Sequence, residues 1–372
     1  MTKSNFERIL IVHPFGIGDA LFVTPVLRAL HDQGAKKIDL VLGSRTRELF
    51  ETNPFVDQIF VIDRDRLKKQ SIFQNWYETA QFLKTLRKNH YELFLDFSLG
   101  RQYAFFTLLF LNISTRVGFS YKNRGIFLNR RMLLKQGFSE RAVAEYYLAL
   151  LDLISVPYST NHLELYLTSE DEKRSVEILR SNGCDPNASY LAVAPGGGES
   201  WGKDARLKRW PVDHFFRLIQ KIEKDVVSFE KVLVLGGKRE WELGEALTQL
   251  EPSRFRNLCG QLPLRSTAAA LKHAQLLLAN DGGLVHMASA VGTPTIAIFG
   301  PVDPKVYGPY PPSPERVAVT NDGPECRPCY QNMRYNSTCE HINCLNMLEP
   351  EYVFQKAERA GLFERLKSAI RK

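Results

Sequence analysis

A chain of 372 residues and 42.5 kDa is long for one domain, because domains usually comprise about 100 to 200 residues, so two domains are expected. Hydrophobic residues make up 44% and charged residues 24%, a balance that excludes a disordered, collagenous or purely coiled-coil protein. The surplus of 49 Lys and Arg over 41 Asp and Glu gives a formal charge of +8, which favours anionic partners such as nucleotides, phosphorylated lipids or nucleic acid.

No stretch of the sequence predicts a membrane-spanning helix or a secretory signal. The densest apolar run, residues 104–113, is interrupted by Thr107 and Asn112 and is far shorter than the roughly 20 residues that a bilayer requires. Near the amino terminus only residues 9–12 are consecutively apolar, whereas a secretory h-region has about 7 to 15 such residues. We therefore expect a cytoplasmic protein, in which the cysteines do not form a disulfide scaffold.

The first half of the chain alternates short β-rich runs with helical patterns. The predicted strands are 8–12, 38–42, 58–62 and 93–97. The predicted helices are 20–31, 76–88 and 103–111. This alternation indicates βαβ units and a parallel sheet with both faces covered. Residues 155–189 then mix loop-forming residues with one short helix, which is typical of a connection between lobes.

The alternation restarts after this connection. The predicted strands are 190–194, 232–235, 276–279 and 295–299. The predicted helices are 211–224, 240–250 and 283–291. We therefore predict two doubly wound lobes, residues 1–165 and 166–348, each with its binding loops at the carboxyl ends of its strands. Residues 349–372 have the pattern of an amphipathic helix.

A glycine-containing turn, Gly16-Ile17-Gly18-Asp19, follows the first predicted strand. It does not complete the dinucleotide-binding pattern G-x-G-x-x-G, because Leu21 occupies the third glycine position and no acidic residue ends the second strand. An oxidoreductase that contacts the extra phosphate of NADP through Arg45 stays open as an alternative. Asp19 can serve as a helix cap, or it can project into a cleft and accept a proton from a substrate hydroxyl.

A second glycine-rich loop has the composition of a phosphate site. Glycines at 196–198 end a predicted strand, and they are followed by Lys203, Arg206, Lys208 and Arg209. Glycines let backbone amides approach an anion, and the cations supply matching charge. A solvated basic loop is the alternative interpretation.

A third loop, residues 280–286, leads from another predicted strand into a helix. Gly282 and Gly283 expose amide donors at the helix N-terminus, where the dipole favours a pyrophosphate. His286 lies one turn further on, so its ring can lean back toward that end. Asp281 can cap the helix or bind sugar hydroxyls. A structural cap and a packed core histidine are the alternatives for these two residues.

Taken in order, these loops resemble glycosyltransferase family 9, the heptosyltransferases that build the inner core of lipopolysaccharide. The resemblance covers nearly the whole chain and rests on Gly16-x-Gly18-Asp19 with Thr24-Pro25, Lys208-Arg209-Trp210-Pro211, Gly236-Gly237, Asp281-x-Gly283-Leu284-x-His286 and Phe299-Gly300-Pro301-x-Asp303-Pro304. It implies a GT-B fold of class α/β with two facing Rossmann-like lobes, the acceptor on the first and the nucleotide sugar on the second. It also implies that the helix at 349–372 packs back on the first lobe.

The resemblance implies a role for each matching residue. Asp19 is the general base, which deprotonates an acceptor hydroxyl so that it attacks the anomeric carbon of ADP-heptose with inversion. Lys208 holds the donor diphosphate, and Glu242, or alternatively Glu240, lies near the nucleoside. The remaining donor-binding residues are Asp281, Gly282, Gly283 and His286. Family members usually have Ser or Thr where this chain has Gly282, so one hydroxyl contact to the phosphates is missing here.

The acceptor that the resemblance implies is an acidic sugar of the lipopolysaccharide core. The candidate residues for contacting it are Arg101, Arg116, Lys122 and Arg124. Each of them is equally well read as part of a solvated basic patch. Together they can also hold the enzyme against the anionic inner face of the inner membrane.

The transfer requires no metal, because a lysine and helix amides can stabilise the departing diphosphate. Asp63-Arg64-Asp65 is similar to the DxD metal motif of GT-A glycosyltransferases, but its place after the third strand favours a surface loop or helix cap. A structural zinc site is predicted from the C-x2-C-x9-C-x4-C spacing, with free or redox-labile thiols as alternatives. Its ligands would be Cys326, Cys329, Cys339 and Cys344.

Other classes of function stay open. A transferase of another nucleotide sugar fits the same motifs, and a nucleotide-sugar epimerase can share the two-lobe fold but would convert the donor without an acceptor. A noncatalytic module would bind nucleotide sugar without turnover. A nucleic-acid binder would need aromatic and basic platforms, whereas this chain concentrates its cations in loops after strands.

Overall fold

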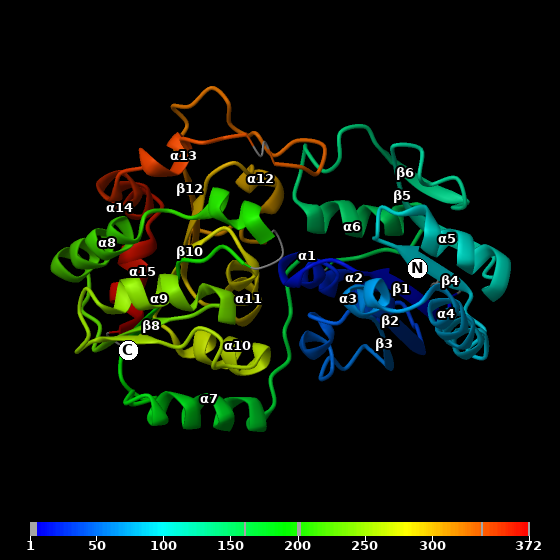
Figure 1. The fold of residues 1–372 in the computed structure, drawn as a ribbon, viewed down its shortest axis with the longest axis horizontal. Coiled ribbons are helices and arrows are strands. Elements are labelled where there is room, and N and C mark those ends of the chain that lie inside the picture. Colours follow the sequence, from blue (N-terminus) through cyan, green and yellow to red (C-terminus); the bar gives the residue numbers. More distant parts are fainter. Residues whose placement is uncertain (1–5, 160, 199–201, 336–337, 371–372) are drawn as a thin grey trace. The chain divides into compact units, whose positions relative to one another are not determined.

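The computed structural model describes residues 6–159, 161–198, 202–335 and 338–370. The chain divides into two compact units, the first ending at His162 and the second beginning at Leu163. Within the described ranges no helix is both long and apolar enough to cross a bilayer. Each unit is built on its own sheet of six parallel strands (Figure 1).

In the first unit the sheet has the order β3-β2-β1-β4-β5-β6. Its strands are β1 (Arg8–His13), β2 (Lys37–Gly43), β3 (Gln58–Ile62), β4 (Leu93–Asp96), β5 (Thr115–Tyr121) and β6 (Arg130–Leu134). The helical segments are α1 (Ile17–Leu21), α2 (Thr24–Asp32), η1 (Arg47–Leu49), α3 (Arg64–Lys69), α4 (Ile72–Arg87), α5 (Arg101–Phe106), the π-helical η2 (Thr107–Leu111) and α6 (Val143–Asp152).

In the second unit the sheet has the order β12-β11-β10-β7-β8-β9. Its strands are β7 (Tyr190–Ala194), β8 (Lys231–Val234), β9 (Phe255–Asn257), β10 (Leu276–Asn280), β11 (Thr295–Phe299) and β12 (Arg316–Thr320). The helical segments are α7 (Ser169–Ser181), η3 (Gly202–Lys208), α8 (Val212–Asp225), η4 (Lys238–Glu240), α9 (Trp241–Thr248), α10 (Leu264–His273), α11 (Gly283–Val291), α12 (Pro304–Tyr307), α13 (Asn343–Asn346), α14 (Pro350–Arg359) and α15 (Leu362–Ile370).

The two sheets have the same winding. Read in chain order, each runs 3-2-1-4-5-6, the order of a Rossmann fold, and every pair of neighbouring strands is parallel. The winding direction reverses between β1 and β4 in the first unit and between β7 and β10 in the second. Loops leaving the carboxyl ends of these strands diverge at that point and leave space for a ligand. The predicted α/β fold of two doubly wound lobes is therefore confirmed.

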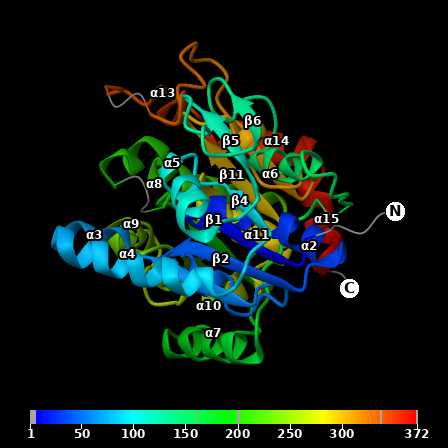
Figure 2. The same ribbon diagram turned by 90° about the vertical axis from the view of Figure 1, so that its right-hand side faces the viewer.

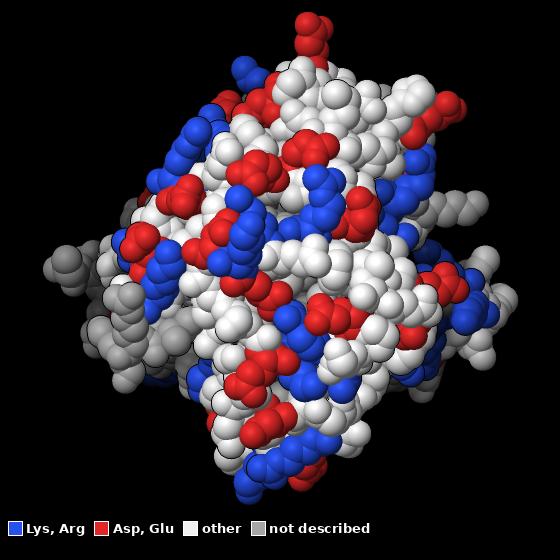
Figure 3. All heavy atoms as spheres, turned by 90° about the vertical axis from the view of Figure 1, so that its left-hand side faces the viewer, with Lys and Arg blue, Asp and Glu red and all other residues white. Residues whose placement is uncertain are grey.

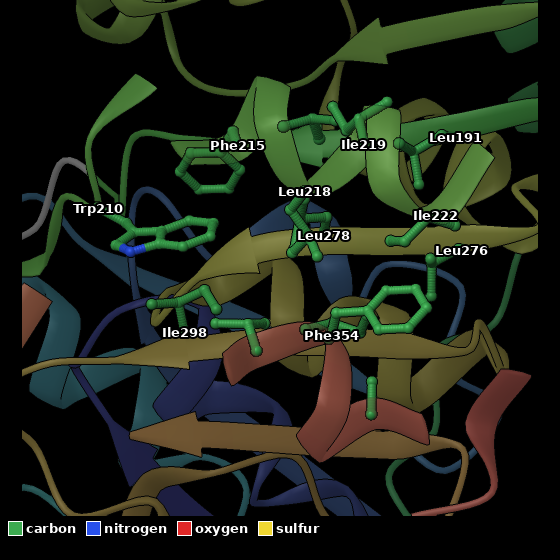
Figure 4. Packing of buried hydrophobic residues seen from close by; sticks show 14 of the residues in the cluster. Leu191, Trp210, Phe215, Leu218, Ile219, Ile222, Leu276, Leu278, Ile298 and Phe354 are labelled. Carbon is green, nitrogen blue, oxygen red and sulfur yellow. The ribbon is translucent and has the colours of Figure 1, made fainter. Parts of the chain in front are cut away.

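The core of the second unit anchors the loop that carries Lys208. Figure 4 shows Trp210 together with Phe215 and Leu218 of α8 above strands β10 and β11. The Trp210 indole is 1% exposed, and its N–H donates a hydrogen bond of 2.8 Å to the carbonyl oxygen of Leu348. Because this large side chain is fixed in the core, the backbone two residues before it, at Lys208, has a defined position.

Residues 349–372 differ from their prediction. Of these, residues 350–359 and 362–370 form two helices, α14 and α15, and Gly361 separates them with a φ of +79°, a left-handed conformation that favours glycine. Phe354 of α14 and Phe363 of α15 stack with their ring centroids 4.8 Å apart, and both belong to the core of the second unit. Their burial there gives these helices a structural role in the second unit, and the packing of this segment on the first lobe stays a prediction.

We expect Phe354→Ala to destabilise the second unit by about 3 to 5 kcal/mol, because it removes a buried aromatic ring and leaves a cavity. Urea unfolding of the full chain, followed by tryptophan fluorescence, measures this loss. Tyr352→Ala is the matched control, since this neighbouring ring on α14 is 37% exposed. Equal losses for the two variants would mean that α14 does not contribute to the core.

Candidate active site

Asp19 lies at the switch point of the first sheet. Strand β1 ends at His13, and α1 begins four residues later with Gly16 in the N-cap position. Glycine has no side chain with which to cap, and Asp19 occupies the first turn of α1, where its half-buried carboxylate benefits from the helix dipole. Asp19 is therefore not the N-cap residue of this helix.

A buried tyrosine close enough to sense the charge of Asp19 contacts a buried histidine in the first unit. Tyr147 of α6 has its hydroxyl 3.2 Å from Nε2 of His13, the last residue of β1. Burial, and secondarily the charge of Asp19, raises the pKa of Tyr147 well above its ordinary value. Burial lowers the pKa of His13 to about 3, so this ring is neutral at neutral pH. Tyr147, which lies near Asp19, is therefore a protonated phenol, and His13 beside Tyr147 is an uncharged imidazole.

A second carboxyl group, Asp96, was missed by the sequence analysis. It ends β4, the strand next to β1, and is paired in register with Val12. Burial raises its pKa to about 7, although one carboxyl oxygen accepts a hydrogen bond of 2.8 Å from the Ser98 amide. An acidic residue ending an otherwise apolar strand was the available sequence signal.

The four predicted acceptor residues fall into two groups. Arg101 begins α5 after the carboxyl end of β4, while Lys122 and Arg124 follow the carboxyl end of β5, and all three are exposed. Arg116 instead lies at the amino end of β5, at the opposite edge of the sheet. Its guanidinium donates to the carbonyl oxygens of Phe127 at 2.9 Å and Ile113 at 2.6 Å, so it stabilises local backbone.

In the second unit one amide side chain joins the two loops of the switch point. Asn280, the last residue of β10, donates from Nδ2 to the carbonyl oxygen of Pro195 at 2.7 Å. Its Oδ1 accepts a hydrogen bond from the Trp210 amide at 3.2 Å. Asn280 therefore holds two segments at the end of β10: the glycine loop after β7, and the backbone at Trp210 that anchors the Lys208 loop.

The charged groups of this half-site form a buried ion pair. Nζ of Lys208 lies 2.7 Å from a carboxylate oxygen of Asp281, and both side chains are less than 10% exposed. His286 of α11 is buried beside them, and burial lowers its pKa to about 4 while Asp281 and Lys208 act on it in opposite directions. Lys208 also lies over the ring of Tyr335, 5.9 Å from its centroid. A lysine, an aspartate and a neutral histidine thus meet at the N-terminus of α11.

Two glycines pack against each other beneath this ion pair. Gly197 has a φ of +81°, and a Cβ added there would lie 3.0 Å from Cβ of Lys208. A Cβ added to Gly282 would lie 3.1 Å from the carbonyl carbon of Gly197. The space beside Gly282 is therefore occupied by the Gly197 backbone, which explains why a larger residue is absent at this position.

The structure places Glu240, not Glu242, against the glycine loop. Glu240 is buried, and its two carboxylate oxygens accept hydrogen bonds of 2.8 Å from the amides of Gly198 and Gly237. Glu242 is exposed in the first turn of α9. An acidic residue three positions after Gly237 has the spacing at which a carboxylate reaches back to the N-cap amide, which was the available sequence signal.

Neither of the two predicted metal motifs, Asp63-Arg64-Asp65 and the cysteine cluster, forms a metal site among the described residues. Asp63 caps α3 by accepting a 3.0 Å hydrogen bond from the Arg66 amide, and the side chain of Asp65 lies outside the described ones. The side chains of Cys326, Cys329, Cys339 and Cys344 range from exposed to buried. Burial raises the pKa of Cys344 to about 11. Among the described residues no three His, Cys, Asp or Glu side chains are grouped to hold a metal ion, so the zinc site stays a prediction.

The fold is that of a GT-B glycosyltransferase, in which each lobe offers a Rossmann-type switch point. The family model for glycosyltransferase family 9 (heptosyltransferase) matches residues 79–338, more than half of the chain. The chain therefore belongs to glycosyltransferase family 9 and is a transferase.

Individual relatives agree with this assignment. The lipooligosaccharide heptosyltransferase 2 of Campylobacter jejuni is 23% identical over 359 residues, which cover 95% of this chain and 98% of that protein. The lipooligosaccharide heptosyltransferase 2 of Haemophilus influenzae is 26% identical over 212 residues, which cover 55% of this chain and 59% of that protein. The structure of Escherichia coli ADP-heptose lps heptosyltransferase II superposes with a TM-score of 0.73 at 19% identity, covering 96% of this chain and 99% of that one.

We expect Asp96→Asn to change the pH dependence of stability. Because the pKa of Asp96 is raised from 3.8 to about 7 on folding, the folded chain binds more protons than the unfolded chain between these values. This group therefore stabilises the fold at low pH, and its contribution is lost at up to about 1.4 kcal/mol per pH unit as the pH rises toward 7. The Asn variant, whose amide oxygen can still accept from Ser98, lacks this loss.

Thermal unfolding of both proteins from pH 5 to pH 8 measures the effect, and the advantage of Asp96→Asn should grow with pH. Asp32→Asn, at an exposed position of the same unit, should follow the wild type at every pH. Parallel curves for Asp96→Asn and the wild type would show that Asp96 does not titrate in this range.

Proposed function

We propose that this chain transfers a heptose from ADP-heptose onto a lipopolysaccharide core, with inversion at the anomeric carbon and Asp19 as the general base. The observation that carries the proposal is the position of Asp19 and of the Lys208–Asp281 pair, each at the switch point of its own sheet. The family, and the activities in the names of the relatives, supply the sugar and the acceptor class. We place the reaction on the cytoplasmic side of the inner membrane.

The donor half-site has the charges that a nucleoside diphosphate needs. A diphosphate would compete with Asp281 for Lys208 and would accept hydrogen bonds from the amides of Gly282 and Gly283 at the start of α11. His286 is neutral, so its ring adds a hydrogen bond without a further charge. As the bond between the anomeric carbon and the phosphate oxygen breaks, Lys208 stabilises the negative charge that develops on the departing ADP. No metal is needed for this step.

The acceptor half-site supplies the base. The acceptor hydroxyl transfers its proton to the Asp19 carboxylate while its oxygen forms the new bond to the anomeric carbon on the face opposite the leaving diphosphate. The neighbouring phenol of Tyr147 stays protonated, so Asp19 carries the negative charge of this cluster. Arg101, Lys122 and Arg124 follow neighbouring strands at the same edge of the sheet, and we propose that they contact the acidic acceptor.

We expect Asp19→Asn to lower kcat by about 10² to 10⁴, the range that a general base contributes, without weakening the binding of ADP. The full chain is incubated with ADP-heptose and a panel of truncated core oligosaccharides, and mass spectrometry detects the added heptose. Asp32→Asn is the control for removing an aspartate from the same unit. Near-normal turnover by Asp19→Asn would refute the base assignment, and donor conversion without acceptor would indicate an epimerase.

The glycine pair provides a test of the donor half-site. Gly197 and Gly198 both have positive φ, +81° and +92°, so alanine strains the backbone at either position. At Gly197 the added Cβ meets Lys208, whereas at Gly198 no atom of the described residues lies within 4 Å of it. We expect Gly197→Ala to weaken ADP binding at least about tenfold more than Gly198→Ala, since displacement of Lys208 removes a charge-assisted contact. Isothermal calorimetry measures both, and equal affinities would place the diphosphate elsewhere.

A further inference from the structure

Helix α4 carries large apolar side chains that the first unit does not cover. Ile72, Phe73, Trp76 and Tyr77 are 84%, 87%, 73% and 61% exposed, and they occupy the first two turns of the helix. We call these four residues the α4 apolar face. Leu86, near the other end of α4, is the buried residue that attaches the helix to the core. Clustered exposure of this kind marks an interaction surface, because single exposed apolar residues are common but contiguous ones are not.

The neighbouring segment η2 extends this surface. Leu108, Leu109 and Phe110 are 39%, 58% and 46% exposed, and η2 contacts α4. Figures 1 and 2 both show α5, which leads into η2, lying beside α4. Two adjacent helical segments therefore expose aliphatic and aromatic side chains.

The charge around this surface is positive. The first unit has 22 Lys and Arg against 15 Asp and Glu, whereas the second has 27 against 26, so nearly all of the net charge lies in the first unit. Residues 63–88 alone contain seven basic and three acidic residues. Lys68 and Lys69 of α3 and Lys84 of α4 are exposed, while the acidic Glu78 is paired with Arg66 at 2.6 Å.

On the second unit, by contrast, basic and acidic side chains are mixed. On the face drawn in Figure 3, where α8 and α14 lie, Lys and Arg are interspersed with Asp and Glu. Lys221 of α8 lies 3.1 Å from Asp225 and 3.2 Å from Glu351, an arrangement in which the charges compensate each other locally. The combination of exposed aromatic rings with a surplus of cations belongs to the first unit.

The position of the α4 apolar face relates it to the acceptor loops of the same sheet. Strand β3 ends at Ile62, α3 follows at once and α4 starts at Ile72. Because parallel strands end at the same edge, the start of α3 shares this edge with the Asp19 turn after β1 and with Arg101 after β4.

We infer that the α4 apolar face and the cations beside it form a docking surface for an anionic phospholipid bilayer. Tryptophan, tyrosine and phenylalanine are the side chains that occupy the boundary between headgroups and acyl chains, and each nearby Lys or Arg is attracted to anionic headgroups. A second copy of the chain is the less favourable occupant, because a two-fold interface would oppose the same positive patch on both copies. The inference rests on the proposed function, because an enzyme with a lipid-linked acceptor must reach the surface of the bilayer.

Flotation of the full chain with vesicles tests this docking surface. We expect binding to vesicles of phosphatidylcholine with one third phosphatidylglycerol, little binding to pure phosphatidylcholine, and release from the anionic vesicles at high salt. Phe73→Ser/Trp76→Ser should lower the affinity at least about tenfold, since burial of one large apolar side chain is worth about a factor of ten or more. Met347→Ser, at a residue of the second unit that is 63% exposed, is the matched control and should bind as the wild type does.

Two further measurements complete the test. Brominated lipids should quench a part of the tryptophan fluorescence that is missing from Trp76→Phe. The variant Phe73→Ser/Trp76→Ser should keep wild-type kcat on a water-soluble, delipidated acceptor. Unchanged vesicle binding by this variant would overturn the inference, as would sedimentation showing a dimer that it dissociates. Vesicle binding needs neither donor nor acceptor, so its failure is distinguishable from failure of the proposed function.

Discussion

The buried ion pair between Lys208 and Asp281 is the interaction around which the second unit is arranged. Removing one partner from such a pair leaves an uncompensated buried charge and typically costs about 3 to 5 kcal/mol. Its geometry is maintained by groups that are not charged: Asn280 holds both loops, Trp210 anchors one of them in the core, and the absence of a side chain at Gly197 lets the loops approach. A pair held in this way is suited to exchange its carboxylate partner for a phosphate with little movement of the backbone.

Two carboxyl groups of the first unit, those of Asp19 and Asp96, lie in different environments. Asp19 is half-buried in the first turn of a helix, where the dipole favours the ionised form, whereas Asp96 is fully enclosed and its pKa is raised to about 7. The raised pKa gives Asp96 a measurable effect on the pH dependence of stability. The exposed side of Asp19 is compatible with the general-base role proposed for it.

The sequence was sufficient to predict the central strands of both sheets and the loops that follow them. It identified β1 and β10 and their exit loops, because a buried parallel strand is a short apolar run and its exit loop carries glycine. It missed β5, β6, β9 and β12, whose arginines and glycine weaken the apolar signal. It also missed helices α6 and α10, and it underestimated α7 although Thr168 and Asp171 form a capping box. Local patterns do not report which partner covers a residue.

The same limit applies to the predicted site residues. Glu240 and Glu242 differ by two positions on one segment, so only the approach of the glycine loop from β7 decides which carboxylate contacts it. Arg116 lies near the amino end of β5 and Lys122 follows its carboxyl end; a seven-residue strand separates these ends by about 20 Å, so the two residues belong to opposite edges of the sheet. The net charge of the whole chain likewise says little until the chain is divided into its two units, because nearly all of this charge lies in the first unit.

A transferase that takes a nucleotide from solution and an acceptor from a lipid surface has two different electrostatic requirements. The donor half-site concentrates its positive charge in one buried lysine and in helix amides, within a unit that is otherwise nearly neutral. The first unit instead spreads its surplus over exposed cations near an uncovered aromatic face. Buried charge selects a ligand by geometry, whereas exposed charge attracts an extended anionic surface without fixing its orientation. The distribution of charge between the units therefore matches the different physical states of the two substrates in the proposed function.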